Sequence, residues 1–295
     1  MFHNYMNTIV APLYELKPNS RLYHYTSLDA IQNIVKEGGL WATDIHYFND
    51  SAELGHTAGL LRSEIRRRLA DGIGNRAILD QMLQWAGERI TNGHTLFVTS
   101  LTPDGNLLSQ WRGYCSYGKG LSLGFSAAHV VRCAAEQSYN LGQCIYDSSR
   151  QREIVRAIIN IVEALAASEG PAPPSKAHPS QSYYPTFSKC EDAILRIAAL
   201  FKDSAFKEEA EWRAVSPVVS DYVHDDIEYR TGQSTLVPYK LFKLVRAGQA
   251  KLELEHLFIG PTPHMGLSMN SLVQFLSRNG LSPNIENGLV PHRET

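Results

Sequence analysis

The sequence has few of the features that mark secreted, membrane or metal-binding proteins. Its 295 residues include only four cysteines, and none of them forms a C-x-x-C pair or a zinc-site spacing with the histidines. The N-terminus lacks a charged segment followed by an apolar run, and no window approaches the roughly 18 apolar residues that a membrane span needs. These absences predict a reducing, cytoplasmic setting, no membrane association and no bound metal.

A strong excess of charge of either sign is also missing. Lys and Arg number 28 against 30 Asp and Glu. This balance excludes a global basic field of the kind that holds nucleic acid nonspecifically. The one basic cluster, Arg62 with Arg66, Arg67 and Arg68 around Glu64, has helical spacing and predicts a solvated helix face.

The remaining pattern indicates an α+β protein of ordinary globular composition, with 43% apolar and 20% charged residues. We expect an N-terminal arm over residues 1–20 and a single α+β domain over residues 21–295, with a β-rich core and inserted and flanking helices. A proline-rich surface excursion is expected at about 170–185. Helices are predicted at 52–69, 76–91, 127–137, 148–168, 187–202 and 268–279, and strands at 21–25, 40–41, 95–101, 121–125, 143–146, 206–215, 227–230, 236–239, 252–259 and 285–290.

Residues 206–215 carry the densest pattern of charge. Read as a strand, this segment places Glu209, Glu211 and Arg213 on one face and Ala210, Trp212 and Ala214 on the other. Two carboxylates about 7 Å apart beside a guanidinium can have their pKa values driven in opposite directions, which suits acid–base work or stabilisation of a cationic transition state. The alternative is an exposed edge strand whose charges prevent aggregation.

His24 lies where a predicted strand ends and a helix begins. Thr26 or Ser27 is a suitable N-cap for that helix, and Tyr25 and Thr26 add stacking and hydroxyl groups beside the imidazole. Ligands often bind at such junctions because unpaired backbone N–H groups gather there. A hydrogen-bonded core histidine is the alternative. Further along, Asn49-Asp50 predicts a turn and the cap of the next helix.

The segment between the strands at 95–101 and 121–125 is predicted to be a loop rich in aromatic residues and glycine. It contains Trp111, Arg112 and Tyr114. Flat aromatic faces beside a fixed positive charge suit the rings and phosphates of a nucleotide. The alternative is a glycine-rich turn in which Trp111 fills a space in the core.

Several separated segments form one pattern. They are Tyr23-His24-Tyr25-Thr26-Ser27, Phe48-Asn49-Asp50 with Glu53, the segment from Ser109-Gln110-Trp111 to Leu123-Gly124-Phe125, Glu209-Ala210-Glu211-Trp212-Arg213, and the endings Ile259-Gly260-Pro261 and Val290-Pro291-His292-Arg293. Together these segments resemble a bacterial family catalogued as domain of unknown function 2971. The resemblance covers roughly residues 21–293 and by itself implies no function.

The order of a strand histidine, an aromatic and serine-containing strand, and a Glu-x-Glu segment also resembles the motif order of ADP-ribosyltransferases. That resemblance implies a core like their split sheet, and NAD as substrate. It implies that His24 bonds a ribose hydroxyl of NAD, that Tyr25 or Tyr114 stacks on nicotinamide, and that Ser122 occupies the middle-strand position.

The same resemblance gives the two glutamates their roles. It implies that Glu211 bonds the nicotinamide ribose and stabilises the oxocarbenium ion as nicotinamide leaves, while Glu209 activates the acceptor nucleophile. The physical chemistry agrees, because a carboxylate stabilises most where positive charge develops in a site with little water. Either glutamate could be the one that aligns with the catalytic residue of the superfamily.

Three functions follow as expectations. The first is an NAD-consuming ADP-ribosyltransferase, or an NAD glycohydrolase on the same scaffold, that acts as a bacterial toxin or in phage defence. Its acceptor would be a protein or a nucleic acid, and its partner an antitoxin or another defence protein. The second is a non-catalytic nucleotide-sensing module in which His24, Trp111, Arg112 and Arg213 bind the ligand and a protein partner responds. The third is a metal-independent hydrolase or nuclease using Glu209 and Glu211 as acid and base.

Overall fold

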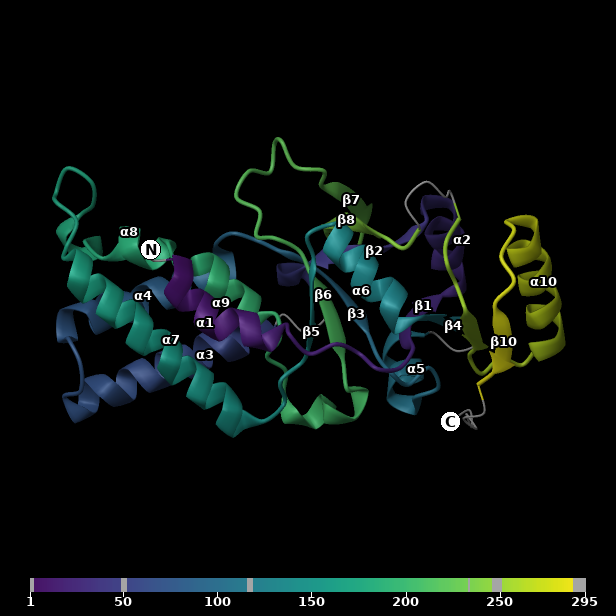
Figure 1. The fold of residues 1–295 in the computed structure, drawn as a ribbon, viewed down its shortest axis with the longest axis horizontal. Helices are drawn as coiled ribbons and strands as arrows, with labels where there is room; N and C mark the ends of the chain where they lie inside the picture. The colour runs from purple at the N-terminus through teal and green to yellow at the C-terminus, as the bar shows by residue number, and fades with distance from the viewer. Residues whose placement is uncertain (1–2, 49–51, 116–118, 233, 246–250, 289–295) are drawn as a thin grey trace.

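Two sheets and a separate group of helices build the fold (Figure 1). The computed structural model describes residues 3–48, 52–115, 119–232, 234–245 and 251–288. The predicted α+β class is confirmed, with about 49% helix and 22% strand. Helices therefore form more of the chain than a β-rich core implied. The Asn49-Asp50 turn, and the C-terminal part of the family resemblance at residues 290–293, lie outside the described residues.

One sheet has four strands and the other has six. The smaller has the order β1-β4-β9-β10 and is antiparallel except for β9 and β10, and the larger has the order β5-β6-β3-β2-β8-β7 and is antiparallel throughout. The strands are β1 (Leu22–Ser27), β2 (Gly39–Asp44), β3 (Phe97–Leu101), β4 (Gly120–Phe125), β5 (Asn140–Gln143), β6 (Trp212–Val215), β7 (Glu228–Thr231), β8 (Leu236–Lys243), β9 (His256–Ile259) and β10 (Asn284–Asn287).

The two sheets are joined where β1 meets the end of β3. The backbone N–H of Tyr23 donates to Thr102 O at 2.7 Å, and the N–H of Thr102 donates to Tyr23 O at 2.9 Å. Because β1 is the edge strand of the smaller sheet, this isolated bridge holds it against the larger one. The strand that carries His24 therefore lies against β3 of the other sheet.

The helices fall into two sets (Figure 1). Among the described residues, no helix is both long and apolar enough to cross a bilayer. Beside the sheets lie α2 (Leu28–Glu37), α5 (Leu108–Tyr114), α6 (Ala127–Glu136) and α10 (Met265–Arg278). The other set, on the left in Figure 1, comprises α1 (His3–Leu13), α3 (Ala52–Asp71), α4 (Arg76–Asn92), α7 (Ser148–Glu169), α8 (Tyr184–Ser188) and α9 (Glu191–Ala198). Three short 3-10 turns are also described, η1 (Ile45–Tyr47), η2 (Pro179–Gln181) and η3 (Ser204–Glu209).

Two apolar cores correspond to these sets, and strands β3 and β6 separate them. Val98 and Val215 pack with the helical set, whereas Phe97 and Ala214, their neighbours in sequence, pack with the core of the sheets. This follows from the alternation of side chains along a strand. The segment expected to be an N-terminal arm joins the helical core, because Met6 and other residues of α1 are buried there.

Most predicted helices form with ends shifted by a few residues, and two predictions are wrong in type. The helix predicted at 187–202 is divided between α8 and α9, and the loop predicted around Trp111 contains helix α5. Part of the strand predicted at 206–215 is instead the 3-10 turn η3. Residues 171–178 of the proline-rich segment have neither helix nor strand and are largely exposed.

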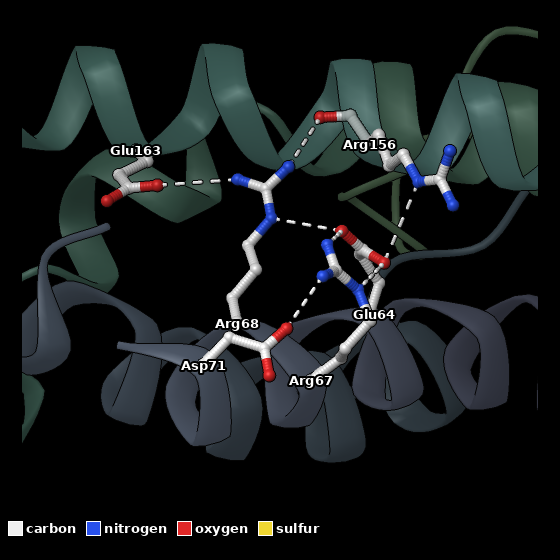
Figure 2. Close-up of polar contacts among 6 residues, drawn as sticks. All are labelled: Glu64, Arg67, Arg68, Asp71, Arg156 and Glu163. Atoms are coloured by element: carbon white, nitrogen blue, oxygen red, sulfur yellow. Dashed lines mark hydrogen bonds and ion pairs between the residues drawn. The ribbon is translucent and has the colours of Figure 1, made fainter. Parts of the chain in front are cut away.

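The arginine cluster of α3 is only partly a solvated face. Arg62, Arg66 and Arg67 are exposed, but the side chain of Arg68 is buried against α7. Figure 2 shows Arg68 between Glu64 of its own helix, at 3.1 Å, and Glu163 of α7, at 3.5 Å. Hydrogen bonds from Arg67 and Arg68 hold the pKa of Glu64 at about 2 against the opposing effect of burial. This network connects α3 to α7.

We expect Glu64→Gln to lower the free energy of unfolding at pH 7 by about 1–3 kcal/mol, because it leaves part of a buried charged hydrogen-bond network unpaired. The folded pKa of Glu64 lies below its unfolded value of about 4.3, so the contribution of the carboxylate is present above about pH 4.5 and is lost as the pH falls toward 2. Denaturation curves at pH 7 and pH 3 measure the difference, which should be smaller at pH 3.

Glu153→Gln is the matched control, because Glu153 forms an exposed pair with Arg150 on the surface of α7. Its effect should stay below about 0.5 kcal/mol at both pH values. An equal loss of stability in Glu64→Gln at pH 7 and pH 3 would contradict the assignment.

Candidate active site

A cavity of about 370 Å³ opens where the two sheets meet. Its walls come from the β1–α2 junction, from β2 and the segment after it, from β3, from the start of β6, and from β7 and the end of α5. The lining side chains are His24, Tyr25, Thr26, Ser27, Ala30, Ile34, Trp41, Thr43, Tyr47, Phe48, Val98, Thr99, Ser100, Tyr114, Glu211, Arg213 and Arg230.

A side hollow of about 50 Å³ adjoins this cavity. The two share His24, Tyr25, Ser100, Tyr114 and Glu211, and the side hollow also reaches Glu209. Glu211 therefore lies in the wall common to both spaces, which is the arrangement needed if two reacting groups approach one centre from different sides.

The chain enters the site through a break in the predicted strand. Asp203 caps η3 by accepting from the N–H of Ala205, and Ala210 then adopts a left-handed conformation with φ of 43°. A strand cannot continue through a residue in that conformation, so β6 begins only at Trp212. The left-handed residue lies between the two glutamates and interrupts the strand there.

The alternative reading of this segment as an exposed edge strand is wrong. Strand β6 lies between β5 and β3 in the larger sheet. Glu209, Glu211 and Arg213 are exposed by only 7%, 5% and 1%. Charges this deeply buried need partners, and here they supply one another.

The partner that unites them is Lys202, which the sequence patterns did not single out. Its Nζ donates to Oε2 of Glu209 and to Oε2 of Glu211, both at 2.5 Å. Arg213 donates from Nε to Oε1 of Glu211 at 2.8 Å and from Nη1 to the carbonyl of Ala199, also at 2.8 Å. We refer to Lys202, Glu209, Glu211 and Arg213 as the charge cluster. The available signal was a lysine that directly ends the apolar run 197–201.

The charge cluster shifts the pKa values of its two carboxyl groups in opposite directions. Burial by itself would raise the pKa of Glu211, but the charges of Arg213 and Lys202 hold it at about 2. For Glu209 burial prevails, and its pKa is raised despite the hydrogen bond from Lys202. The pKa of Lys202 is also raised, because Glu211 and Glu209 outweigh the opposing effect of burial. Glu211 is thus a permanent anion, while Glu209 is the carboxyl group readier to carry a proton.

His24 faces the same spaces as a neutral imidazole. Its Nδ1 lies 3.0 Å from the carbonyl oxygen of Ser100. A carbonyl only accepts, so Nδ1 carries the proton, and Nε2 is the acceptor in the neutral ring. Burial lowers the pKa of His24, which favours this neutral form. The predicted strand followed by a capped helix is confirmed, with Ser27 as the cap, but β1 continues to Ser27 and His24 therefore lies in the middle of the strand instead of near its end.

The aromatic residues predicted to bind a ligand are divided by the structure. Tyr25 lines the cavity, and its hydroxyl donates to Asp104 O at 2.9 Å and accepts from the N–H of Leu107 at 2.7 Å. Tyr114 also lines the cavity and remains 46% exposed. Trp111 is buried edge-on against Tyr25 and donates to Asn106 Oδ1, so it has the core-filling position that was its alternative reading.

Of the remaining predicted residues, Thr26 and Arg213 line the cavity, whereas Arg112 and Ser122 do not. Arg112 is exposed on α5, and Ser122 is fully buried on β4 opposite Tyr25. The lining also includes residues that the sequence patterns did not single out, among them Trp41, Thr43, Thr99 and Arg230. These four come from strands β2, β3 and β7.

Removing the ammonium group of Lys202 should lower the stability of the folded protein at neutral pH. We expect Lys202→Met to lower the free energy of unfolding by about 3–5 kcal/mol at pH 7, because Glu209 loses its cation and Glu211 keeps Arg213 alone. Burial already raises the pKa of Glu209, and without Lys202 it rises further above its unfolded value of about 4.3. The penalty is therefore largest above this folded pKa and fades as the pH falls toward about 4. Denaturation curves between pH 4 and pH 8 measure it.

Lys207→Met removes an exposed lysine from the adjacent turn η3 and is the matched control. The double change of Lys202→Met with Glu209→Gln should regain part of the lost stability, since no uncompensated charge is left at residue 209. A Lys202→Met protein no less stable than Lys207→Met would show that the charge cluster does not hold the site together.

Comparison with known proteins adds one result to this geometry. No curated protein and no solved structure matches the chain. A family model described as protein of unknown function (DUF2971) matches residues 110–214, which is narrower than the span suggested by the motifs. The matched part runs from α5 to β6 and contains the whole charge cluster. Residues 110–214 thus support the predicted membership of the DUF2971 family, whose function is unknown.

Proposed function

We propose that the chain is an NAD-consuming enzyme, an ADP-ribosyltransferase or an NAD glycohydrolase, with NAD bound in the cavity. The observation that carries the proposal is the ionised Glu211 in the cavity wall, with its pKa at about 2 in a buried setting. When the bond between nicotinamide and ribose breaks, the ribose carbon becomes cationic. A fixed carboxylate beside that carbon lowers the barrier most where water is scarce.

The rest of the wall offers suitable contacts for such a substrate. The neutral His24 can accept a hydrogen bond from a ribose hydroxyl through Nε2. Tyr114 supplies an aromatic face at the border of the cavity and the side hollow, where nicotinamide could stack. A volume of about 370 Å³ lies within the usual size range of small-molecule sites.

Glu209 is placed to act on the second reactant. It borders the side hollow, which shares Glu211 with the cavity. In the proposed step, the bond between nicotinamide and C1′ breaks and nicotinamide leaves as a neutral molecule. A hydroxyl oxygen then bonds to C1′ and its proton passes to Glu209. Water as the nucleophile gives ADP-ribose, whereas a hydroxyl of another molecule gives ADP-ribosylation.

A second candidate is a nucleotide-sensing module that binds without turnover. The observation in its favour is that both glutamates are already engaged by Lys202 and Arg213, as they would be in a purely structural charge cluster. In this reading the ligand contacts come from His24 and Arg213, because Trp111 is buried and Arg112 lies outside the cavity wall.

The first test is nicotinamide release from NAD by the purified protein, with and without cell lysate as a source of acceptor. We expect Glu211→Gln to reduce release by about 100-fold or more while NAD affinity changes only a few-fold, because the carboxylate acts mainly in the transition state. Glu208→Gln, an exposed neighbour, should release nicotinamide at the wild-type rate.

Melting curves must accompany this comparison, since Glu211 also neutralises Lys202 and Arg213. His24→Ala provides a second variant outside the charge cluster and should weaken NAD binding. Nicotinamide release at the wild-type rate by a folded Glu211→Gln protein would show that Glu211 does not stabilise the transition state. No release by the wild type under either condition would favour the sensing module.

The pH dependence of release tests Glu209 separately. A general base works only when deprotonated, so release should rise with pH through a pKa above the ordinary range of a carboxyl group. Glu209→Gln should lower the rate and abolish this rise. The measurement is the pH profile of the release rate at saturating and at low NAD, and an unchanged profile in Glu209→Gln would assign the base elsewhere.

A further inference from the structure

The cavity wall contains a second cation, Arg230, whose setting differs from that of Arg213. Arg230 projects from β7, the edge strand of the larger sheet, and is partly buried. Its Nη2 donates to Oγ1 of Thr43 at 3.1 Å, and its guanidinium carbon lies 5.5 Å from the centre of the Trp41 ring. Thr43 and Trp41 both belong to β2, so the side chain of Arg230 reaches back across β8 toward the cavity.

The charge of Arg230 has no counterpart in the described structure. Within those residues no ion pair joins Arg230 to a carboxylate, and its Nε is buried without a hydrogen-bond partner. The contrast with the other two buried arginines is sharp, because Arg213 is paired with Glu211 and Arg68 with Glu64 and Glu163. A partly buried guanidinium with unused donors in a cavity wall is a site for an anion that comes from outside the chain.

Two hydroxyl groups increase the capacity of this wall to bind an anion. Thr43 accepts from Arg230 and keeps its own hydroxyl proton to donate. Thr99 of β3 is only 2% exposed, lines the cavity, and has no partner for its Oγ1. The first turn of α2 contributes less, because the N–H groups of Leu28 and Ala30 are already bound to Lys119 O and to the Ser27 side chain.

The spacing of the strands fits one ligand that spans both charged walls. Strand β2, over which Arg230 lies, is separated from β6 by β3 alone. Two strand spacings amount to roughly 10 Å. A nucleotide with its ribose beside Glu211 would cover part of this distance with its 5′-phosphate, and the side chain of Arg230, which reaches across β8 to the wall at β2, offers a cation to that phosphate.

We propose that Arg230, with Thr43 and Thr99, forms a subsite for the phosphate adjoining the ribose of a nicotinamide nucleotide. The inference rests on the proposed function for the identity of the ribose end, and it adds a residue and a chemical role that the motif resemblance does not assign. Arg230 binds the substrate and holds it in register with Glu211, and takes no part in bond breaking.

The test compares two ligands that differ by this phosphate alone. Nicotinamide mononucleotide and nicotinamide riboside are titrated by calorimetry into the wild type, Arg230→Gln and Arg230→Lys, with inorganic pyrophosphate as a probe that lacks the nucleoside. We expect the wild type to bind the mononucleotide at least 10-fold more tightly than the riboside. Arg230→Gln should reduce that ratio to about 2 or less while leaving riboside affinity unchanged, and Arg230→Lys should retain part of it.

Arg278→Gln, which removes an exposed arginine of α10 away from the cavity, is the control and should preserve the full preference. A preference that persists in folded Arg230→Gln, or a wild type with no preference for either the mononucleotide or pyrophosphate over the riboside, would overturn the subsite. Arg230-dependent binding of pyrophosphate without any nicotinamide release would retain the subsite and reject the enzymatic function. Nicotinamide release whose rate and KM are both unchanged in Arg230→Gln would reject the subsite and retain the enzymatic function.

Discussion

The site depends on one buried ammonium group. Lys202 follows the last helix of the helical set, and its Nζ holds the two glutamates that precede β6. Its backbone is fixed as well, because the N–H of Lys202 donates to Ile145 O and its carbonyl accepts from the side chain of Gln151 on α7. The charge cluster therefore joins the helical core to the sheets at the same point where it forms the cavity wall. Stability and chemistry cannot be varied independently at this position.

The charge of the cavity wall changes from the charge cluster at β6 toward β7. At β6 lies the ionised Glu211, paired with Arg213, and the neutral imidazole of His24 lies beside it on β1. Toward β7 lies Arg230, which has no carboxylate partner among the described residues. A ligand complementary to this wall carries negative charge at one end and develops positive charge at the other. A nucleotide that loses a neutral base from its ribose has that polarity during the reaction, whereas a uniformly anionic or apolar ligand does not.

How much could be foreseen depends on the range of the interactions involved. The β1–α2 junction with His24 was predictable because alternation, a capping serine and the closing Gly38 are all local signals. The pairing of Glu209 with Glu211 was recognised, but the strand drawn through them was wrong, since a left-handed alanine has no reliable sequence signature. Lys202 escaped notice because its contacts form only once the turn η3 folds Glu209 and Glu211 back onto it, and Arg230 because it bonds a residue of β2 that is distant in sequence. Trp111 misled because an aromatic residue that fills a core resembles one that binds a ring.

The sheet order also determines when during biosynthesis the protein can acquire its cavity. Strand β1 and the bridge to Thr102 are available early, yet β6 pairs with β3 only after residues 102–211 have been made, and the arginine of β7 follows later still. A ribosome-bound chain that ends before η3 has neither glutamate nor the arginine of the opposite wall. At the usual elongation rate of about 5–20 residues per second, the nascent protein spends roughly 10–40 s with His24 already made and no site around it. Under the proposed function, NAD cleavage in the producing cell could begin only after synthesis has passed both β6 and β7.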